Sequence, residues 1–517
     1  MRFLYRTAIK KTVLLVLALS GYFTEIQAAR ELTIEQARAL AMTQSLNIES
    51  QIQAYLVNSD NEKAAKWVYE PEFQAIARQE ITDVDNFNVD SASSNSTFTD
   101  REDSTYLASL QSVLPTGGTI ALENRFIDRI DNFGAGIFNN NSNIYRRQFQ
   151  AFAGINFQQP LLKKAESLND PNNRYAKVQI QLAEKQSEIA FQKLRQDLSE
   201  FLAGVEISYW ELNHAIQLTK TWEQSVASAT QILADNKERV RLGRMADLEL
   251  LETESEVAQR ETELKDASIK VSNAQAKLYN YFSEVFALMD EPLIPTEVPS
   301  LVPINETREE ALSYSLQNHP LYLQKKEEAE RQGLVLLYAE NQRLPQLDLN
   351  LSYGFNGLAD TVTNSLKKLD DFDKVSWTAA VQLNVPILGN RQAYHQMAAA
   401  KRNKRKALID LKETETQILN NIHSAYVNLK IGFETQQRNI QNVEFKEELL
   451  EAELVKLDEG KSNSREVFEV EKKLTEAKVK ELEKVLEYQK YLIVLSFSKG
   501  KFLAERNIDF EKEAVIE

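Results

Sequence analysis

The stretch from Asn173 to Val285 contains no proline, and it limits the possible folds more than any other part of the chain. Within it, Gly243 is typical of a helix stop and Asp247 of a helix N-cap. Apolar residues recur at every seventh position on both sides of this break, which favours helices that supercoil against a neighbour. These positions, interrupted by Thr219, are Phe191, Leu198, Val205, Leu212, Val226, Leu233 and Val240, then Leu250, Val257, Leu264, Val271, Leu278 and Val285. We therefore predict a hairpin of two long helices, the first roughly 100 Å in length at 1.5 Å per residue.

The same pattern occurs again later in the chain. A shift of 217 residues aligns Tyr209 with Tyr426 and Gly243 with Gly460, and the polar Gln436 then matches Thr219. A second shift, of 274 residues, aligns two helix starts and two prolines: Thr33 with Thr307, and Pro71 with Pro345. An internal duplication of this length means that one architecture is built from two similar halves.

The duplication sets the predicted boundaries. The second half follows the plan of the first, and a segment with four prolines separates them. The predicted parts are a signal peptide at 1–28; a first repeat at 29–289, with a helix at 33–69, strands within 72–160 and a helical hairpin at 173–285; an equatorial linker at 290–305; a second repeat at 306–504, with a helix at 307–343, strands within 346–386 and a helical hairpin at 390–502; and a charged, loosely ordered tail at 505–517.

Composition excludes several classes of protein. The 517-residue chain has a formal net charge of −15, which argues against a nucleic-acid partner. It contains no cysteine, so disulfides, thiol chemistry and a lipid-modified N-terminal cysteine are excluded. Residues 1–28 combine a basic start, a short apolar middle and a small-residue end, the pattern of a secretory signal. An N-terminal anchor helix is the alternative, but the apolar run is short for a bilayer.

Several segments alternate between apolar and polar residues with the period of a β-strand. The clearest are Gln346–Phe355 and Ser376–Val385, with Phe149–Pro160 in the first half, and Tyr106–Phe126 reads as a hairpin turning at Leu114–Gly118. Segments of about ten residues with one apolar and one uncharged polar face are typical of outer-membrane strands, although soluble sandwich strands also alternate. Trp377, at a strand start, fits an interfacial aromatic girdle.

Four or six strands per chain cannot close a membrane barrel. An open sheet edge in lipid leaves unpaired backbone groups, each of which costs several kcal/mol. We therefore expect several subunits to share one barrel, giving a mainly α fold with a membrane β-barrel part.

The whole mature chain resembles the TolC-like outer-membrane efflux family, the channel-tunnel proteins of Gram-negative bacteria. The resemblance rests on the order helix, strands, helical hairpin, occurring twice, and on short motifs at the strand ends and hairpin turns: Gln159-Pro-Leu-Leu162, Val385-Pro-Ile-Leu388, Leu242-Gly-Arg244, Asp247-Leu-Glu-Leu-Leu251, Glu459-Gly-Lys461 and Ser464-Arg-Glu-Val-Phe468. It implies a homotrimer in the outer membrane, a shared twelve-stranded barrel and a periplasmic helical tunnel. It also implies that the tunnel docks a periplasmic adaptor (membrane-fusion) protein of a tripartite pump or type I secretion system, and through it an inner-membrane pump or ABC exporter. The Tyr106–Phe126 hairpin is extra relative to the simplest members, so a wider barrel is possible.

The resemblance places the predicted sites at the two hairpin turns. The expected adaptor-docking residues are Leu242, Gly243, Arg244, Glu459, Gly460 and Lys461. Asp458 and Glu459, repeated by symmetry, are the expected acidic ring at a periplasmic gate. The simpler interpretation is that the glycines only end helices and that the acids are solvated surface groups.

Catalysis has little support in the sequence. The four histidines (His214, His319, His395 and His423) show no metal-ligand spacing, and no phosphate-binding glycine loop is present. We therefore expect no catalytic residue, cofactor or metal, and a passive exit duct that a partner protein energises. The alternatives are a periplasmic coiled-coil adaptor or structural protein without a pore, and a hydrolytic enzyme on a helical scaffold.

Overall fold

The computed structural model describes residues 30–86, 97–133, 144–163, 175–243, 245–282, 292–387 and 389–508. The predicted signal peptide lies outside this part of the chain. The chain forms two compact units. Unit 1 comprises Met1–Val57, Glu188–Lys326 and Ile409–Glu517, and unit 2 comprises Asn58–Ser187 and Glu327–Leu408. Each unit therefore draws on both halves of the sequence, whereas the predicted boundaries follow the chain linearly.

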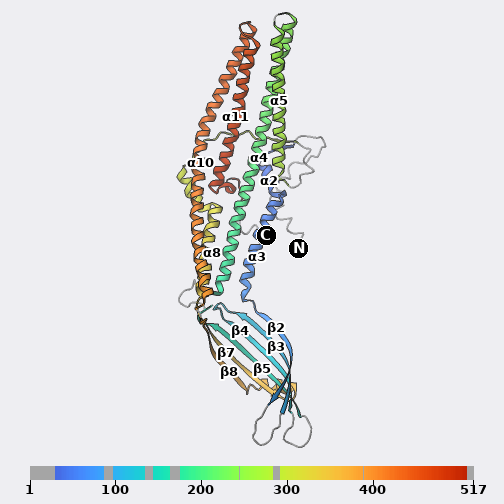
Figure 1. Ribbon diagram of the computed structural model, residues 1–517, viewed down its shortest axis with the longest axis vertical. Helices are drawn as coiled ribbons and strands as arrows, with labels where there is room; N and C mark the ends of the chain where they lie inside the picture. Colours follow the sequence, from blue (N-terminus) through green and yellow to red (C-terminus); the bar gives the residue numbers. More distant parts are fainter. Residues whose placement is uncertain are drawn as a thin grey trace. The chain divides into compact units, whose positions relative to one another are not determined.

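Unit 1 is built from helices (Figure 1). Two long hairpins lie side by side in it, one formed by α4 and α5 and the other by α10 and α11. A small parallel sheet of β1 and β6 lies beside them, with Arg30 opposite Leu293. The elements are β1 (Arg30–Leu32), α2 (Ile34–Gln44), α3 (Leu46–Lys66), α4 (Tyr175–Arg241), α5 (Asp247–Tyr279), β6 (Leu293–Pro295), α7 (Arg308–Asn318), α8 (Pro320–Asn341), α10 (Arg391–Asp458), α11 (Ser464–Ser498) and α12 (Phe502–Glu505), of which α3, α4, α8 and α10 continue into unit 2.

The apolar seam predicted along α4 is only partly confirmed. Leu198, Val205 and Leu212 are fully buried, as the repeat predicts. Further along the helix, the buried position shifts to one residue earlier in each repeat, so that Ser225 and Ile232 are buried in place of Val226 and Leu233. The shift follows a change of packing partners along α4. Val205 and Leu212 belong to a core cluster with Leu32 and Leu278. Nearer the C-terminal end of α4, Ile232 belongs to a different cluster with Val257 and Val467.

Two expected helices are each broken into two. In place of one helix at 33–69, α2 ends at Gln44, Ser45 adopts an extended backbone, and α3 ends in a 3-10 turn at Trp67–Tyr69. In place of one helix at 307–343, α7 ends before His319, which is also extended. His319 precedes Pro320, and the residue before a proline is sterically disfavoured in helical conformation. Both breaks lie at matching places in the two halves.

The hairpin starts also differ in detail from the prediction. Asp247 was predicted as the N-cap of α5, but the cap is Ala246, with φ −80° and ψ 148°, and no side chain caps this helix. Asp247 is instead the first helical residue, where its negative charge lies favourably near the helix N-terminus. In the second hairpin the cap is Asn463, whose side chain accepts a hydrogen bond from the Glu466 amide. Thr33 and Thr307 form the capping boxes typical of their sequences.

Unit 2 contains one six-stranded antiparallel sheet in the order β2-β3-β4-β5-β7-β8 (Figure 1). Of the predicted four or six strands, the described residues of this unit form six. The strands of the first half are longer than the predicted hairpin at Tyr106–Phe126, because β3 and β4 both extend beyond it, and a further helix, α9, lies between the last two strands. The elements are β2 (Glu72–Asn86), β3 (Thr97–Val113), β4 (Thr119–Phe133), β5 (Ile144–Pro160), β7 (Gln346–Ala359), α9 (Val362–Asp370) and β8 (Val375–Asn384).

Among the helices in the described part of the chain, none combines the length and the hydropathy needed to cross a bilayer.

Candidate functional site

The sheet has one face covered with exposed apolar side chains. Directly paired residues on adjacent strands point to the same face, so the pairs Tyr106–Phe126 and Tyr353–Trp377 define this side. We call it the apolar face. Its exposed large apolar residues are Phe73, Ile81, Tyr106, Leu110, Ile120, Leu122, Ile155, Leu351, Tyr353, Val375, Trp377, Val381 and Leu383. A contiguous group of this many exposed apolar side chains on one sheet face marks a surface that contacts lipid or another protein.

The opposite face, here called the polar face, carries charged and hydrogen-bonding side chains. Arg129 pairs with Asp103 at 2.8 Å and Arg101 with Asp131 at 3.1 Å across neighbouring strands. On β7 and β8 the same face bears short polar residues, among them Asn350, Ser352, Ser376 and Thr378. Among the described strand residues, the exposed large apolar side chains on this face are Ile76 and Leu358. The alternation predicted from the sequence is therefore confirmed, although β2 to β4 are more charged than expected.

Aromatic rings form a row near the loop end of the apolar face. The rings of Tyr106 and Phe126 are 6.4 Å apart and those of Phe126 and Phe149 are 5.9 Å apart. One pleat beyond Phe149, the guanidinium of Arg147 binds Asp128 at 2.5 and 2.9 Å. Eight residue steps, roughly 27 Å along a strand, separate Phe149 from Phe157 at the other end of the apolar face. An apolar band of about 25 Å edged by aromatic residues is typical of an outer-membrane barrel.

Both edges of the sheet are open. Every residue of β8 is exposed, and so is every residue of β2 from Glu72 to Thr82. Because the sheet has an even number of antiparallel strands, its two edges run in opposite directions. The edge of one copy can therefore continue the edge of another in the antiparallel sense.

The first hairpin turn presents apolar side chains to solvent. Gly243 has φ +70°, a left-handed conformation that glycine adopts without strain, and its amide donates to the Val240 carbonyl at 2.8 Å. Leu242 is 51% exposed, and Leu248 and Leu251 are more exposed still. A side chain added at Gly243 would meet no atom within 4 Å. Arg244 lies outside the described residues.

The second hairpin turn is polar. Gly460 has φ +74°, and the Lys461 amide donates to the Lys456 carbonyl at 2.8 Å, which closes the end of α10. Glu459 is exposed, and its carboxylate binds the Lys461 ammonium at 2.7 Å. This pairing reduces the negative charge that Glu459 presents. The side chain of Asp458 lies outside the described residues.

Below the turns, hydrogen bonds join the two hairpins. Ser464 of α11 donates to the Asn236 amide oxygen of α4 at 2.7 Å, and the Asn236 amide nitrogen donates to Thr253 of α5 at 2.9 Å. All three side chains are buried. Because a buried polar group that loses its partner costs free energy, this chain of bonds holds α11 against the first hairpin.

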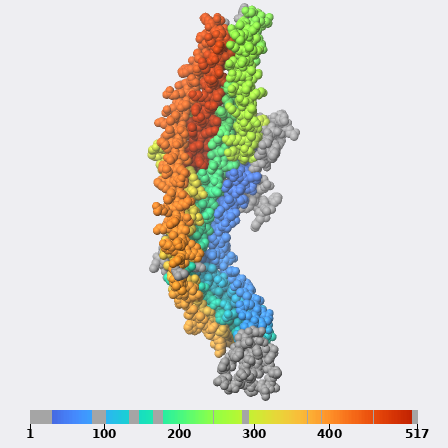
Figure 2. Space-filling model, in the orientation of Figure 1, coloured from blue at the N-terminus to red at the C-terminus, as the bar shows by residue number. Residues whose placement is uncertain are grey.

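A buried ion pair makes the second connection between the hairpins. Arg260 of α5 binds Glu471 of α11, and each side chain is 5% exposed. The Arg260 guanidinium also donates to the Ser225 hydroxyl at 3.2 Å and lies 5.1 Å from the Phe468 ring centre. The surfaces of α5 and α11 meet along this region (Figure 2). Apolar residues around the pair exclude water, so the two hairpins cannot separate here without exposing or parting these charges.

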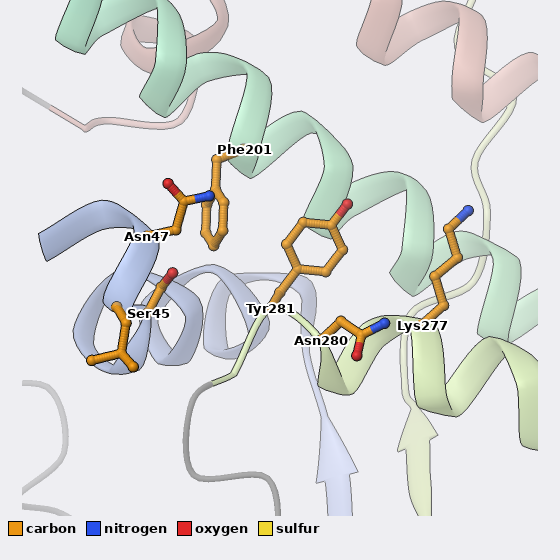
Figure 3. Close-up of a pocket in the computed structure, with 7 residues that line it drawn as sticks. Ser45, Asn47, Phe201, Lys277, Asn280 and Tyr281 are labelled. Carbon is orange, nitrogen blue, oxygen red and sulfur yellow. The ribbon is translucent and has the colours of Figure 1, made fainter. Parts of the chain in front are cut away.

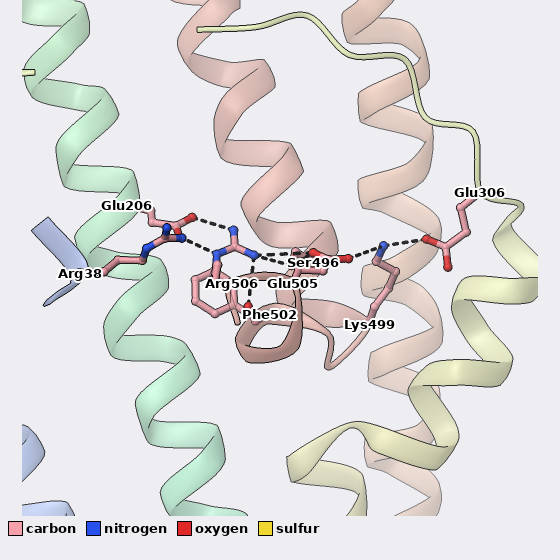
Figure 4. Close-up of polar contacts among 8 residues, drawn as sticks. All are labelled: Arg38, Glu206, Glu306, Ser496, Lys499, Phe502, Glu505 and Arg506. Atoms are coloured by element: carbon pink, nitrogen blue, oxygen red, sulfur yellow. Dashed lines mark hydrogen bonds and ion pairs between the residues drawn. The ribbon is translucent and has the colours of Figure 1, made fainter. Parts of the chain in front are cut away.

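A charged network ties the C-terminal segment to unit 1 (Figure 4). The buried Glu206 of α4 accepts hydrogen bonds from Arg506 at 2.6 and 2.7 Å and from Arg38 at 2.9 Å. Arg506 also stacks on the Phe502 ring, 3.7 Å from its centre. The prediction of a loosely ordered tail from residue 505 is therefore wrong for Glu505 to Ile508, because these ion pairs and the burial of Phe502 hold the segment in place.

The described part of unit 1 contains a cavity of about 350 Å³ at the break between α2 and α3. Figure 3 shows its lining, which includes Phe201, Tyr281 and Lys277. The Lys277 ammonium is paired with Glu211 at 2.6 Å. The cavity therefore presents ordinary packing residues and a satisfied charge.

The histidines lie on separate elements. His214 is on α4, His319 links α7 and α8, and His395 and His423 are on α10. Burial, with a smaller effect of Arg195, lowers the pKa of His319 to about 4. Among the described residues, no group of three or more His, Cys, Asp or Glu side chains is placed to hold a metal ion.

The sequence predictions missed Arg260 and Glu471, although a signal was present. Arg260 lies three residues after Val257, at a core position of the seven-residue pattern, and Glu471 lies between the buried Val467 and Leu474 at the same kind of spacing. Opposite charges at core positions of two helices indicate a buried pair. Which helices would meet could not be read from either segment alone.

Comparisons with known proteins identify the fold. No family model matches the chain, and no curated protein matches its sequence. Among solved structures, the Campylobacter jejuni CmeC outer membrane channel matches with 13% identity, a TM-score of 0.64 and coverage of 93% of this chain and 90% of that one. A membrane protein from Pseudomonas aeruginosa matches with 13% identity, a TM-score of 0.63 and coverage of 93% and 91%. The outer membrane protein VceC from Vibrio cholerae matches with 11% identity, a TM-score of 0.62 and coverage of 90% and 96%. The chain therefore has the fold of the TolC-like outer-membrane channels, the family that its sequence resembles.

Proposed function

We propose that this protein is the outer-membrane exit duct of a tripartite efflux pump or a type I secretion system. The sheet inserts into the outer membrane of a Gram-negative bacterium, and the helices extend into the periplasm as a tunnel. The observation that supports this proposal most strongly is a sheet with an exposed apolar face, a polar face and two open edges. Transport through the duct is passive, and energy comes from an inner-membrane pump or ABC exporter reached through an adaptor.

The open edges support a barrel shared between copies. In lipid, the unpaired groups of β2 and β8 have no water to bind, so each edge requires a partner strand. Edges of opposite direction allow β8 of one copy to pair with β2 of the next around a closed ring. Three copies, the number that the family resemblance implies, would supply three times six strands, or eighteen, rather than the twelve of the simplest members. Three copies of the duplicated helical part would then form the tunnel wall.

The hairpin turns support adaptor docking. Leu242 and Gly243 lie at one turn, and Glu459, Gly460 and Lys461 lie at the other. Arg244, which is outside the described residues, is the sixth proposed docking residue. The exposed leucines near Gly243 offer an apolar surface, and the space around both glycines is open to a partner helix. The first turn would contribute burial of apolar area, and the second would contribute charge complementarity.

The connections between the hairpins support gating at the same end. Arg260 is bound to Glu471 and Ser464 to Asn236, so α11 is held against the first hairpin, and we assign this arrangement to the closed state of the proposed duct. Opening requires both connections to part. Asp458 and Glu459, repeated by symmetry, would place an acidic ring at the closed mouth, which Lys461 partly neutralises.

The alternative is a periplasmic coiled-coil adaptor or structural protein without a pore. The apolar face argues against it, because a protein that stays in water would cover the thirteen large apolar residues that are exposed on this face among the described residues. A hydrolytic enzyme is disfavoured by the scattered histidines.

Purification and reconstitution test the proposal. The protein should require detergent, migrate as a trimer by native mass spectrometry, and produce discrete conductance steps in planar lipid bilayers. Alkaline carbonate washing of membranes should leave it in the pellet. A monomer that remains soluble without detergent and conducts no ions would refute the proposal and favour the pore-less alternative.

A further inference from the structure

One helix of unit 2 lies on the apolar face itself. The helix α9 lies in the connection between β7 and β8 and packs against β7 and β5. A β-carbon built at Gly357 would lie 2.0 Å from the Ser365 carbonyl oxygen of α9, so the helix sits directly on the sheet there. Gly357 pairs with Ala151, and both belong to the apolar face by register with Tyr353 and Ile155.

The position of α9 along the strands is defined by its neighbours. It covers Phe149, Ala151 and Ala359, which are buried although thirteen other described residues of the apolar face are exposed. Phe149 belongs to the aromatic row, and Arg147 one pleat further on begins the charged zone. The helix therefore lies at the level where the apolar face ends.

The helix has three different sides. Ser365 and Leu369 are buried against the sheet. Val362 and Leu366, four residues apart, are each more than 40% exposed and share a second, apolar side. Lys367 is exposed beside them, and the Lys368 ammonium donates to the Leu358 carbonyl at 2.8 Å.

An exposed aromatic residue lies just beyond the helix, after its C-cap Asp371. Phe372 is 61% exposed, and its ring meets Phe355 edge to face at 4.8 Å. Its φ of +51° is unusual for a bulky residue and strains the backbone. The exposed Phe372 ring adds to the apolar surface that Val362 and Leu366 present. Asp360, Asp371 and Asp373 flank the helix, so its local charge is mixed and apolar contact dominates any attraction to a surface.

We propose that α9 is an interfacial helix that binds the outer leaflet of the membrane, an inference that rests on the proposed membrane barrel. Val362, Leu366 and Phe372 enter the upper acyl-chain region, and Lys367 contacts the phosphate groups of the lipid headgroups. A helix with an apolar side and a charged side that lies in the plane of a membrane boundary has this chemistry. Its binding would fix the depth of the barrel in the bilayer.

The absence of cysteine allows a direct test, because a single introduced cysteine is labelled uniquely. Full-length protein carrying a nitroxide at Leu366→Cys would be reconstituted into phosphatidylethanolamine–phosphatidylglycerol vesicles. Accessibility to oxygen, which concentrates in acyl chains, would be compared with accessibility to a water-soluble nickel chelate. Matched labels at Lys367→Cys on the helix, Val381→Cys on the apolar face and Thr378→Cys on the polar face provide references.

The expected result is a high oxygen-to-nickel ratio at residue 366, close to that at 381, with a several-fold lower ratio at 367. A ratio at 366 as low as that at 378, while 381 still reports lipid, would overturn the proposal for α9 and leave the barrel intact. Exclusion of both reagents from 366 would also overturn it, since a protein surface would then cover the helix. If 381 itself reported water, the proposed function would fail.

A second measurement does not depend on a label. Leu366→Asp should lower the fraction that inserts into vesicles several-fold, whereas Thr363→Asp, exposed on the same helix, should not. Both variants should fold in detergent, because neither side chain is buried. Equal insertion of the two variants would contradict a role of α9 in lipid binding.

Discussion

The buried pair between Arg260 and Glu471 allows the proposed gate to be tested quantitatively. Glu471→Gln keeps the shape of the side chain but leaves the Arg260 guanidinium charged in a site where it is 5% exposed. Removing one partner of a buried pair costs about 3–5 kcal/mol. The two bonds to Ser225 and the contact with Phe468 remain, so we expect the lower end of this range.

This cost falls on the closed state. An uncompensated guanidinium can regain water only if α11 moves away from α5, so separation of the hairpins relieves it. A penalty of about 3 kcal/mol changes the ratio of closed to open forms by roughly a hundredfold. In planar bilayers, the Glu471→Gln variant should therefore show a higher open probability than the wild type, and Arg260→Met should do the same.

The double variant Arg260→Met/Glu471→Met is the matched control. Replacement of a buried ion pair by apolar residues of similar volume is often neutral or stabilising. It should restore a mostly closed duct while both single variants conduct. Single variants that lose stability in urea but conduct no more than the wild type would refute the gating role and assign the pair to folding alone. A double variant as open as the single ones would refute the electrostatic reasoning.

Three further predictions concern stability. Burial lowers the pKa of His319 to about 4, below its value of about 6.5 in the unfolded chain, so neutral His319 stabilises the fold fully above pH 6.5 and this stabilisation is lost as the pH falls through 4. Between pH 7 and pH 4 the wild type should therefore lose about 3 kcal/mol of unfolding free energy that the His319→Gln variant keeps. Arg506→Leu leaves Glu206 with Arg38 alone and should cost about 3 kcal/mol in urea unfolding, whereas Lys461→Ala at an exposed turn should cost about 0.5 kcal/mol or less; equal effects would contradict the network in Figure 4. Gly354→Val brings a β-carbon within 2.6 Å of the Phe152 ring and 2.7 Å of the Ala153 carbonyl oxygen, so it should destabilise the folded sheet by about 1–3 kcal/mol. The yield of heat-resistant oligomer should fall for this variant, whereas Ser352→Ala on the same strand face should be tolerated.

The long hairpins and the two faces of the sheet could be predicted because each rests on a local period. Every seventh residue marks a coiled helix and every second residue marks a half-buried strand, and both patterns are uninterrupted by proline. The turns at Gly243 and Gly460 follow from the same logic, since glycine at a helix end has a specific conformational role. These features depend on residues close together in the chain.

The features that escaped prediction depend on residues far apart, or on weak local signals. The break at Ser45 has no proline to mark it, and only its match to the Pro320 break in the other half could have suggested it. The helix α9 is nine residues long and follows a strand without a strong boundary. The pair of Arg260 and Glu471 depends on which helices touch, a fact set by tertiary packing.

The two additional strands have a consequence for the lining of the proposed barrel. Barrel diameter grows roughly in proportion to strand number, so eighteen strands would enclose a wider lumen than twelve. The charged residues of the polar face lie mainly on β2 and on the extra hairpin of β3 and β4, whereas β7 and β8 contribute mostly short hydroxyl and amide side chains. Among the described residues, the arginines at 78, 101, 125 and 129 each pair with an acid on the same face, at 2.7, 3.1, 3.7 and 2.8 Å. A lining of paired charges is well hydrated but carries little net field, so the proposed barrel would present a polar lumen without a strong preference for either sign of charge.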